Sequence, residues 1–318
     1  MSKPARPSTP YGGVPATVSA DEFRERTISR LKSIQTHLET APRLGRLRGK
    51  VCVITGVGSL QGIGRATALT FAHEGSQHLY LIDFDGTNLP DLKDTIAKRY
   101  PDVEVTTIEA DAADEEAISG VCKQALQEEG RLDVFFANAG LGTNRHLHDI
   151  SAEQYMHVMR VNALSCFLAV KYASQAMMKA NPSRGKQFSG GSIILTASVA
   201  GLNSGGGALD YSASKAAVNS MAKTAAYQLM RTDVRVNAIC PGLIETGMTS
   251  GMFNYARARG NESKIGQLNA IGRYAVAQEI ANAALFLASD EASYVNGQNW
   301  AVDGALASSM PTVPGRWA

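Results

Sequence analysis

Short apolar runs alternate with helical patterns along most of the chain, starting near Lys50. Seven of these runs are rich in β-branched residues and apolar on both faces, which is typical of parallel strands covered by helices on both sides. They span residues 50–55, 78–83, 103–110, 132–138, 191–198, 234–240 and 298–304. Strands separated by helices form βαβ units. The pattern therefore predicts an α/β fold with a doubly wound, seven-stranded parallel sheet, built as a single domain from residues 46–305.

The first 45 residues have a different pattern and are interpreted as an extension. Residues 1–20 carry four prolines and little that could be buried, which predicts a flexible arm. Ser19 and Glu22 then have capping-box spacing. The apolar residues that recur at helical intervals after them are Phe23, Ile28, Leu31, Ile34 and Leu38. We expect one amphipathic helix over about residues 20–40, packed on the main domain or on another subunit, and a C-terminal tail over residues 306–318.

Composition excludes several classes of protein. The formal net charge is +2 and no block of lysine and arginine occurs, so nucleic acid is not an expected partner. No apolar stretch is long enough to span a bilayer, and the N-terminus lacks the apolar core of a signal peptide. The four cysteines are widely spaced, which indicates neither a disulfide framework nor a metal site. A cytoplasmic setting, with no membrane and no metal, is expected.

A glycine-rich turn, TGVGSLQGIG, lies between the first predicted strand and the first helix. Glycines there let the backbone approach a pyrophosphate, and the helix N-terminus beyond them supplies amide donors. A tight turn without a ligand is the alternative. The residues assigned to the cofactor from this turn are Gly56, Gly58, Gln61, Gly62, Ile63 and Gly64.

The end of the second strand favours NAD as the cofactor. Asp83 can accept hydrogen bonds from the adenosine ribose, and its charge would repel the 2′-phosphate of NADP. The adjacent Phe84 offers no compensating cation. Arg65 is the one cation nearby in the sequence, and it could equally be a solvated side chain. NADP is therefore the less favoured alternative.

Tyr211 and Lys215 are four residues apart, so on a helix their side chains lie on one face. A lysine ammonium about 5 Å away, at an effective dielectric of 20, stabilises a phenolate by about 3 kcal/mol. Such a pair can serve as a proton donor and acceptor near neutral pH. An ordinary amphipathic helix that happens to carry both residues is the alternative.

Other motifs in the same order resemble those of the short-chain dehydrogenase/reductase family, from about Leu47 to Ala305. These motifs are TGVGSLQGIG, ANAG, VNALSCF, GSIILTASVAG, YSASK, PGLIETGM and VNGQNWAVDG. Ser198 stands thirteen residues before Tyr211, as it does in the family. Two features depart from the family pattern: the glycine turn is two residues longer, which leaves the roles of Gly56 and Gly58 open, and Ala137 replaces an asparagine.

The resemblance implies a Rossmann fold and a role for each matching residue. Tyr211 would be the general acid and base, assisted by Lys215, which would also bind the nicotinamide ribose. Ser198 would polarise the substrate carbonyl, and Asn162 would hold a helix and a water beside Lys215. The further cofactor contacts that it implies are Asp111, Ala112, Asn138, Ala139, Gly140, Pro241, Gly242, Ile244 and Thr246. Asp111 could instead cap a helix.

The function predicted from these residues is NAD(H)-dependent interconversion of a secondary alcohol and a ketone. The alternatives are an NADPH-dependent oxoacyl or quinone reductase, a catalytically silent Rossmann binding protein, and a methyltransferase that uses S-adenosylmethionine. The resemblance also implies a homotetramer or homodimer built on the helices that carry Asn162 and Tyr211. A short lid helix is expected at Met248, Met252 and Phe253, and it could either contact the substrate or simply pack on its own domain.

A set of basic side chains near the predicted cleft could meet an anionic substrate or simply be solvated. They are Arg145, His146, His148, Arg257 and Arg259.

Overall fold

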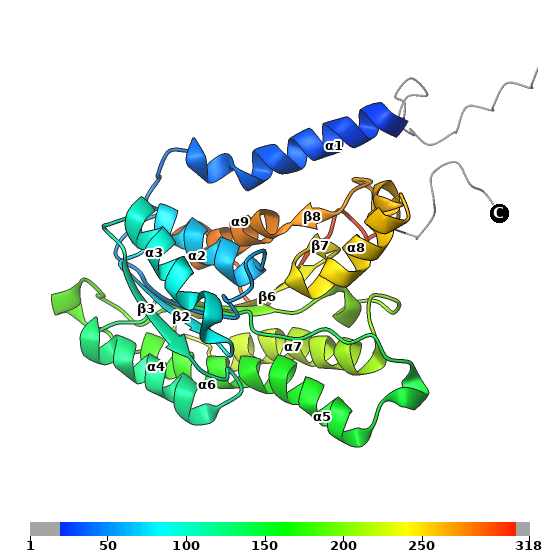
Figure 1. Cartoon of the computed structure of the whole chain (residues 1–318). Helices are drawn as coiled ribbons and strands as arrows, with labels where there is room; N and C mark the ends of the chain where they lie inside the picture. Colours follow the sequence, from blue (N-terminus) through cyan, green and yellow to red (C-terminus); the bar gives the residue numbers. More distant parts are fainter. Residues whose placement is uncertain (1–19, 310–318) are drawn as a thin grey trace, which may run out of the picture.

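A parallel β-sheet forms the centre of the computed structural model, which describes residues 20–309 (Figure 1). Its strand order is β3-β2-β1-β4-β5-β6-β9, and every pairing is parallel. The strands are β1 Val51–Thr55, β2 His78–Asp83, β3 Glu104–Glu109, β4 Val134–Ala137, β5 Gly191–Thr196, β6 Val234–Pro241 and β9 Asn299–Val302. The fold prediction is therefore confirmed. The order reverses between β1 and β4, the position where such sheets bind ligands.

Helices cover both faces of the sheet (Figure 1). On one face lie α2 Ile63–His73, α3 Leu89–Arg99 and α9 Ala277–Ala288, which share one apolar core with that side of the strands. On the other face lie α4 Glu115–Glu128, α6 Ser165–Met177 and α7 Leu209–Gln228. Helix α5, Ala152–Met159, continues into α6 through a π-helical segment, Arg160–Leu164. Burial on both faces explains why the strands are apolar throughout.

A second, two-stranded sheet lies beyond the carboxyl end of β6. It pairs β7 Ile244–Glu245 with β8 Ala275–Val276, and the lid helix α8, Ser250–Ala258, lies between these strands in the sequence. A strand of two residues is too short to show an alternation of apolar and polar positions, so the sequence pattern did not predict these strands.

The N-terminal helix packs on its own chain. It is α1, Ala20–Gln35, followed by a 3-10 turn at His37–Glu39. Leu31 is buried among Phe253 of the lid helix, Tyr274 and Val276. In Figure 1, α1 lies above α9 and β8. The sequence left two docking surfaces open for this helix, and in the structure it docks on the main domain. Ser19, the N-terminal arm and residues 310–318 of the tail lie outside the described residues.

Replacing Leu31 by alanine should lower the free energy of unfolding by about 2 kcal/mol, because the truncation leaves a cavity under α1. The matched control is Ile28→Ala on the same helix, whose side chain is 53% exposed, and we expect a change within about 0.5 kcal/mol. Urea denaturation measures both values. Equal effects for the two variants would mean that α1 does not pack as described.

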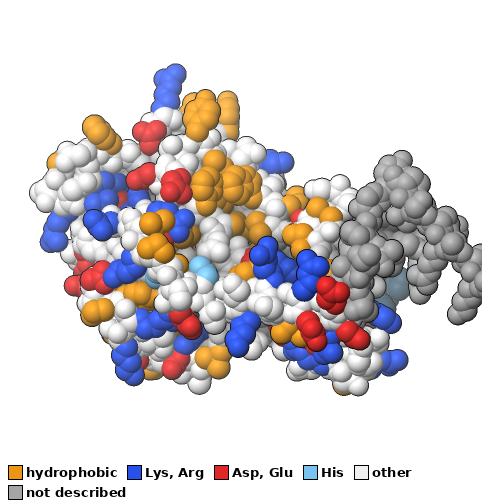
Figure 2. Space-filling view, turned by 90° about the horizontal axis from the view of Figure 1, so that it is seen from above, with side chains coloured by type: hydrophobic (Ala, Val, Ile, Leu, Met, Phe, Trp, Pro, Cys, Tyr) orange, Lys and Arg blue, Asp and Glu red, His pale blue; other side chains and the backbone are white. Residues whose placement is uncertain are grey.

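The distribution of charged side chains and the burial of the cysteines agree with the small net charge and the widely spaced cysteines of the sequence. On the face seen in Figure 2, lysine and arginine side chains are interspersed with acidic and apolar ones. All four cysteines are buried free thiols, and burial raises the pKa of Cys240 to about 11. Among residues 20–309, no helix is long and apolar enough to cross a membrane.

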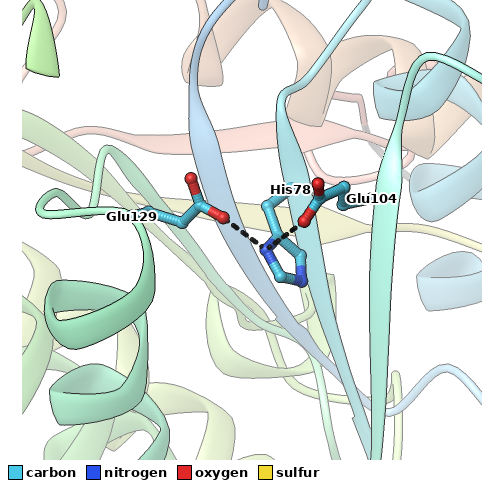
Figure 3. A group of neighbouring side chains, drawn as sticks. All are labelled: His78, Glu104 and Glu129. Atoms are coloured by element: carbon cyan, nitrogen blue, oxygen red, sulfur yellow. Dashed lines mark hydrogen bonds and ion pairs between the residues drawn. The ribbon is translucent and has the colours of Figure 1, made fainter.

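A histidine and two glutamates meet at the amino end of the sheet (Figure 3). The Nδ1 atom of His78 lies 2.8 Å from Glu129 Oε1 and 3.6 Å from Glu104 Oε2. Its Nε2 atom lies 2.8 Å from the hydroxyl of Thr106. Because both ring nitrogens already have protein partners, this group is a structural contact that joins α4, β2 and β3.

Candidate active site

A cleft of about 580 Å³ opens at the carboxyl ends of the central strands, where the strand order reverses. The residues that line it are Gly56, Ser59, Gly62, Ile63, Asp83, Asn138, Gly140, Leu141, Gly142, Thr196, Ala197, Ser198, Tyr211, Lys215, Pro241, Gly242, Ile244, Thr246, Gly247, Met248 and Thr249. Segments far apart in the sequence therefore meet here, and most residues predicted for the catalytic set and the cofactor are among them.

The tyrosine and lysine lie on α7, as their spacing predicts. Tyr211 is partly exposed toward the cleft, whereas Lys215 is buried. The Lys215 ammonium donates to the carbonyl oxygen of Thr196 at 2.8 Å and lies 5.7 Å from the centre of the Tyr211 ring. The ammonium group is thus held by β5 near the Tyr211 ring.

Ser198 follows β5 and begins the 3-10 turn Val199–Gly201. Its Oγ accepts a hydrogen bond from the backbone N–H of Ala200 at 3.1 Å. Within the described residues its hydroxyl donates to no protein acceptor. The hydroxyl proton is therefore available for a carbonyl oxygen in the cleft.

Asn162 lies in the π-helical segment and is fully buried. Its Oδ1 accepts from the backbone N–H of Leu141 at 2.8 Å, and its Nδ2 donates to the Leu141 carbonyl and to Ser214 Oγ. A methyl group on Gly140 would lie 3.1 Å from Asn162 Oδ1 and 3.3 Å from Lys215 Nζ, so a side chain at position 140 would crowd both groups. Asn162 thus ties the loop after β4 to α7, and its contact to a water stays a prediction.

The glycine turn brings three chain segments into close contact. Gly56 has φ of +75°, and a methyl group on it would lie 2.8 Å from the backbone of Ala139. A methyl group on Gly64 would collide with the carbonyl oxygen of Gly56, which also accepts from Asn138 Nδ2 at 3.0 Å. Gly62 begins α2 and provides no side-chain cap, so the first amides of that helix remain available to a ligand.

The longer turn folds against the end of β2. The backbone N–H of Gly58 donates to Asp83 Oδ2 at 2.6 Å, and that of Asp85 donates to Asp83 Oδ1 at 3.0 Å. A methyl group on Gly58 would lie 2.8 Å from the carboxyl carbon of Asp83. The structure thus separates the two glycines: Gly56 lines the cleft and Gly58 fits against Asp83.

Arg65 is not exposed to solvent, so the interpretation of Arg65 as a solvated side chain is wrong. It is buried and forms an ion pair with Asp91 of α3. The sequence could not show this pairing, because 26 residues separate the two side chains.

Several predicted cofactor contacts lie outside the cleft lining. Gln61 and Phe84 are exposed, while Gly64 and Ala139 lie behind the glycine turn. Asp111 and Ala112 follow β3; Asp111 accepts from Ala113 N at 2.8 Å and from Arg160 at 2.6 Å. Burial raises the pKa of Asp111, but these two donors outweigh burial and hold the pKa below its usual value. Their contacts with a cofactor stay predictions.

The segment that contains the lid helix contributes residues both to the cleft and to the protein interior. Met248, just before α8, lines the cleft, whereas Phe253 is buried under α1. Arg257 is engaged by Glu245 and Glu262, whose hydrogen bonds raise its pKa. Arg259 donates to Tyr255. These two arginines thus have protein partners, which favours a structural role over substrate binding.

Comparison with known proteins gives consistent matches. A family model described as enoyl-(acyl carrier protein) reductase matches residues 56–306. A 3-oxoacyl-(acyl-carrier-protein) reductase of Thermotoga maritima is 37% identical over 263 residues, which cover 82% of this chain and 99% of the relative. The structure of levodione reductase has a TM-score of 0.73 at 31% identity, covering 83% of this chain and 100% of that one. Carveol dehydrogenase from Mycobacterium avium in complex with NAD has a TM-score of 0.74 at 30% identity, with coverage of 83% and 100%.

The parallel sheet, the glycine turn and the tyrosine–lysine pair define an oxidoreductase with a Rossmann fold. Because the family model and the relatives cover most of its length, the chain belongs to the short-chain dehydrogenase/reductase family. The resemblance of the motifs is thereby confirmed.

Proposed function

We propose that the protein is an NAD(H)-dependent oxidoreductase that interconverts a secondary alcohol and a ketone. The observation that carries the proposal is the meeting of Ser198, Tyr211 and Lys215 in one cleft, with Asp83 at its far end. The relatives named above include reductases of carbonyl compounds, which supports the reaction class.

The residues present fit a nicotinamide dinucleotide. The crowded glycine turn lets backbone amides and the uncapped start of α2 approach a pyrophosphate, which side chains would prevent. Asp83 offers a carboxylate to ribose hydroxyls and would repel a 2′-phosphate. Arg65 forms an ion pair with Asp91, which leaves it less available to bind such a phosphate. When bound, the nicotinamide supplies or accepts the hydride.

The side chains of this chain then handle the proton and the carbonyl. Ser198 Oγ–H donates to the carbonyl oxygen and withdraws electron density from its carbon. In reduction the Tyr211 hydroxyl gives its proton to the same oxygen and becomes a phenolate, and in oxidation the Tyr211 phenolate takes that proton back. Lys215, fixed by the Thr196 carbonyl, stabilises the phenolate that results. Met248 and Leu141 line the same cleft and offer it apolar side chains.

Turnover of a panel of ketones and secondary alcohols, each with NADH or NADPH and the matching oxidised forms, tests the proposal. We expect measurable rates with NAD(H) on several neutral carbonyl compounds. The runner-up is an NADPH-dependent oxoacyl reductase, favoured by the printed name of the Thermotoga maritima relative. Rates confined to NADPH and acyl thioesters would establish that alternative instead, and no turnover on any substrate would favour a silent binding protein.

Assembly into a homodimer or homotetramer is part of the proposal, as is a cytoplasmic setting. Leu164 and Phe167, three residues apart at the start of α6, are 38% and 48% exposed, which supports contacts between copies through this helix. Sedimentation velocity measures the mass, and a monomer at micromolar concentration would contradict this part.

A further inference from the structure

Asp210, the residue before Tyr211, is a fully buried carboxylate whose hydrogen bonds are incomplete. Its Oδ1 accepts from the hydroxyl of Thr143 at 2.6 Å and from the backbone N–H of Tyr211 at 2.8 Å. Its Oδ2 is buried without a hydrogen-bond partner. The Arg145 guanidinium lies 3.9 Å from that oxygen, which is beyond hydrogen-bond distance.

Such a carboxylate lowers the stability of the folded protein, because burial removes its hydrogen bonds to water and the protein replaces only some of them. Within residues 20–309, Arg145 is the one cation in ion-pair distance of Asp210. The Arg145 side chain is 40% exposed, so it can move. A shift of about 1 Å would bring it into hydrogen-bond contact.

The partners of Asp210 belong to the loop that follows β4. Asn162 holds this loop at Leu141 through two hydrogen bonds, and Asp210 holds it at Thr143. Between them stands Gly142, where an added methyl group would lie 3.1 Å from the sulfur of Met248. Leu141, Gly142 and Met248 all line the cleft. The loop is therefore part of the cleft wall, and at Gly142 it lies close to Met248, which precedes the lid helix.

We infer that Asp210 is a positioning residue, which fixes the loop 141–145 as the substrate-side wall of the cleft through Thr143 and is completed by Arg145 when that wall closes. This inference rests on the proposed function, since it assigns the wall to the substrate of that reaction. It also gives Arg145 a partner within the protein, in place of an anionic group of the substrate. A simpler alternative is that Asp210 only stabilises the start of α7 through the helix dipole.

Steady-state kinetics of Thr143→Val and Arg145→Gln separates the two explanations. The control is Lys123→Gln on α4, an exposed residue outside the cleft whose side chain has no hydrogen bond or ion pair among the described residues. We expect both test variants to raise the KM for a ketone about 5- to 20-fold, as for the loss of a hydrogen bond to a charged group, with kcat changed less than about 3-fold. The Kd for NADH, from nicotinamide fluorescence, should stay at the wild-type value, as should every constant of Lys123→Gln.

Asp210→Asn keeps the shape of the side chain and removes its charge. In this background, Arg145→Gln should have no further effect on KM, because the two groups act on each other. Wild-type KM values for Thr143→Val and Arg145→Gln would overturn the inference and leave the helix-dipole role. If Asp210→Asn fails to fold, the single variants still decide. Failure of the proposed function itself would appear separately, as full activity of Tyr211→Phe.

Discussion

Replacing Tyr211 by phenylalanine should lower kcat/KM for ketone reduction by about 10²- to 10⁴-fold, the range usual for loss of a general acid. The substitution removes one oxygen atom and leaves the ring that packs beside Gly207 and Lys215. NADH binding, measured by fluorescence, should therefore change little. The loss should appear in kcat, because the proton is transferred in the transition state.

Tyr227→Phe is the matched control for this experiment. It makes the same chemical change on the same helix, at a tyrosine that is 73% exposed and outside the cleft lining. Wild-type kinetics are expected for it. A Tyr211→Phe enzyme as active as Tyr227→Phe would remove Tyr211 from the mechanism and favour a different proton donor.

Replacing Asp83 by asparagine should raise the ratio of kcat/KM with NADPH to kcat/KM with NADH by about 10- to 100-fold. The reason is that a carboxylate beside a 2′-phosphate is a like-charge contact, which costs several kcal/mol. Asparagine keeps one oxygen to accept from the amide of Gly58 or Asp85, so the glycine turn should retain most of its shape.

Asp85→Asn removes the same charge two residues away, where the carboxylate is exposed and caps Thr87. Its cofactor ratio should match the wild type. A wild-type enzyme that already prefers NADPH would show that Asp83 does not face the ribose as proposed.

Most of the fold and the placement of Tyr211 and Lys215 on one helix could be predicted, because both depend on local patterns. The seven strands are apolar on both faces, and the spacing of Tyr211 and Lys215 places them on one side of any helix. Ser198 and Asn162 were identified from motifs in a fixed order, and the structure brings Ser198 into the cleft and holds Asn162 beside it.

The features that were missed depend on tertiary contacts. Arg65 could be placed on the first helix but its partner Asp91 is on the next one. Leu31 was expected in an apolar stripe, yet nothing in its spacing indicated that the stripe would meet the lid helix at Phe253. Nothing in the sequence singles out Asp210; only the fold shows that Thr143 donates a hydrogen bond to it and that Arg145 lies near it. The spacing of residues in the sequence does not show which side chains of different helices, strands and loops contact one another.

The contact between Gly58 and Asp83 links the two roles proposed for this part of the cofactor site. The turn that would carry the phosphates is ordered by the same carboxylate that would select the ribose. A residue at position 83 with no acceptor oxygen would therefore also alter the shape of that turn, and a side chain at position 58 requires a smaller residue at position 83. Redesign of this enzyme for another nucleotide has to treat the two positions as one unit and vary them together.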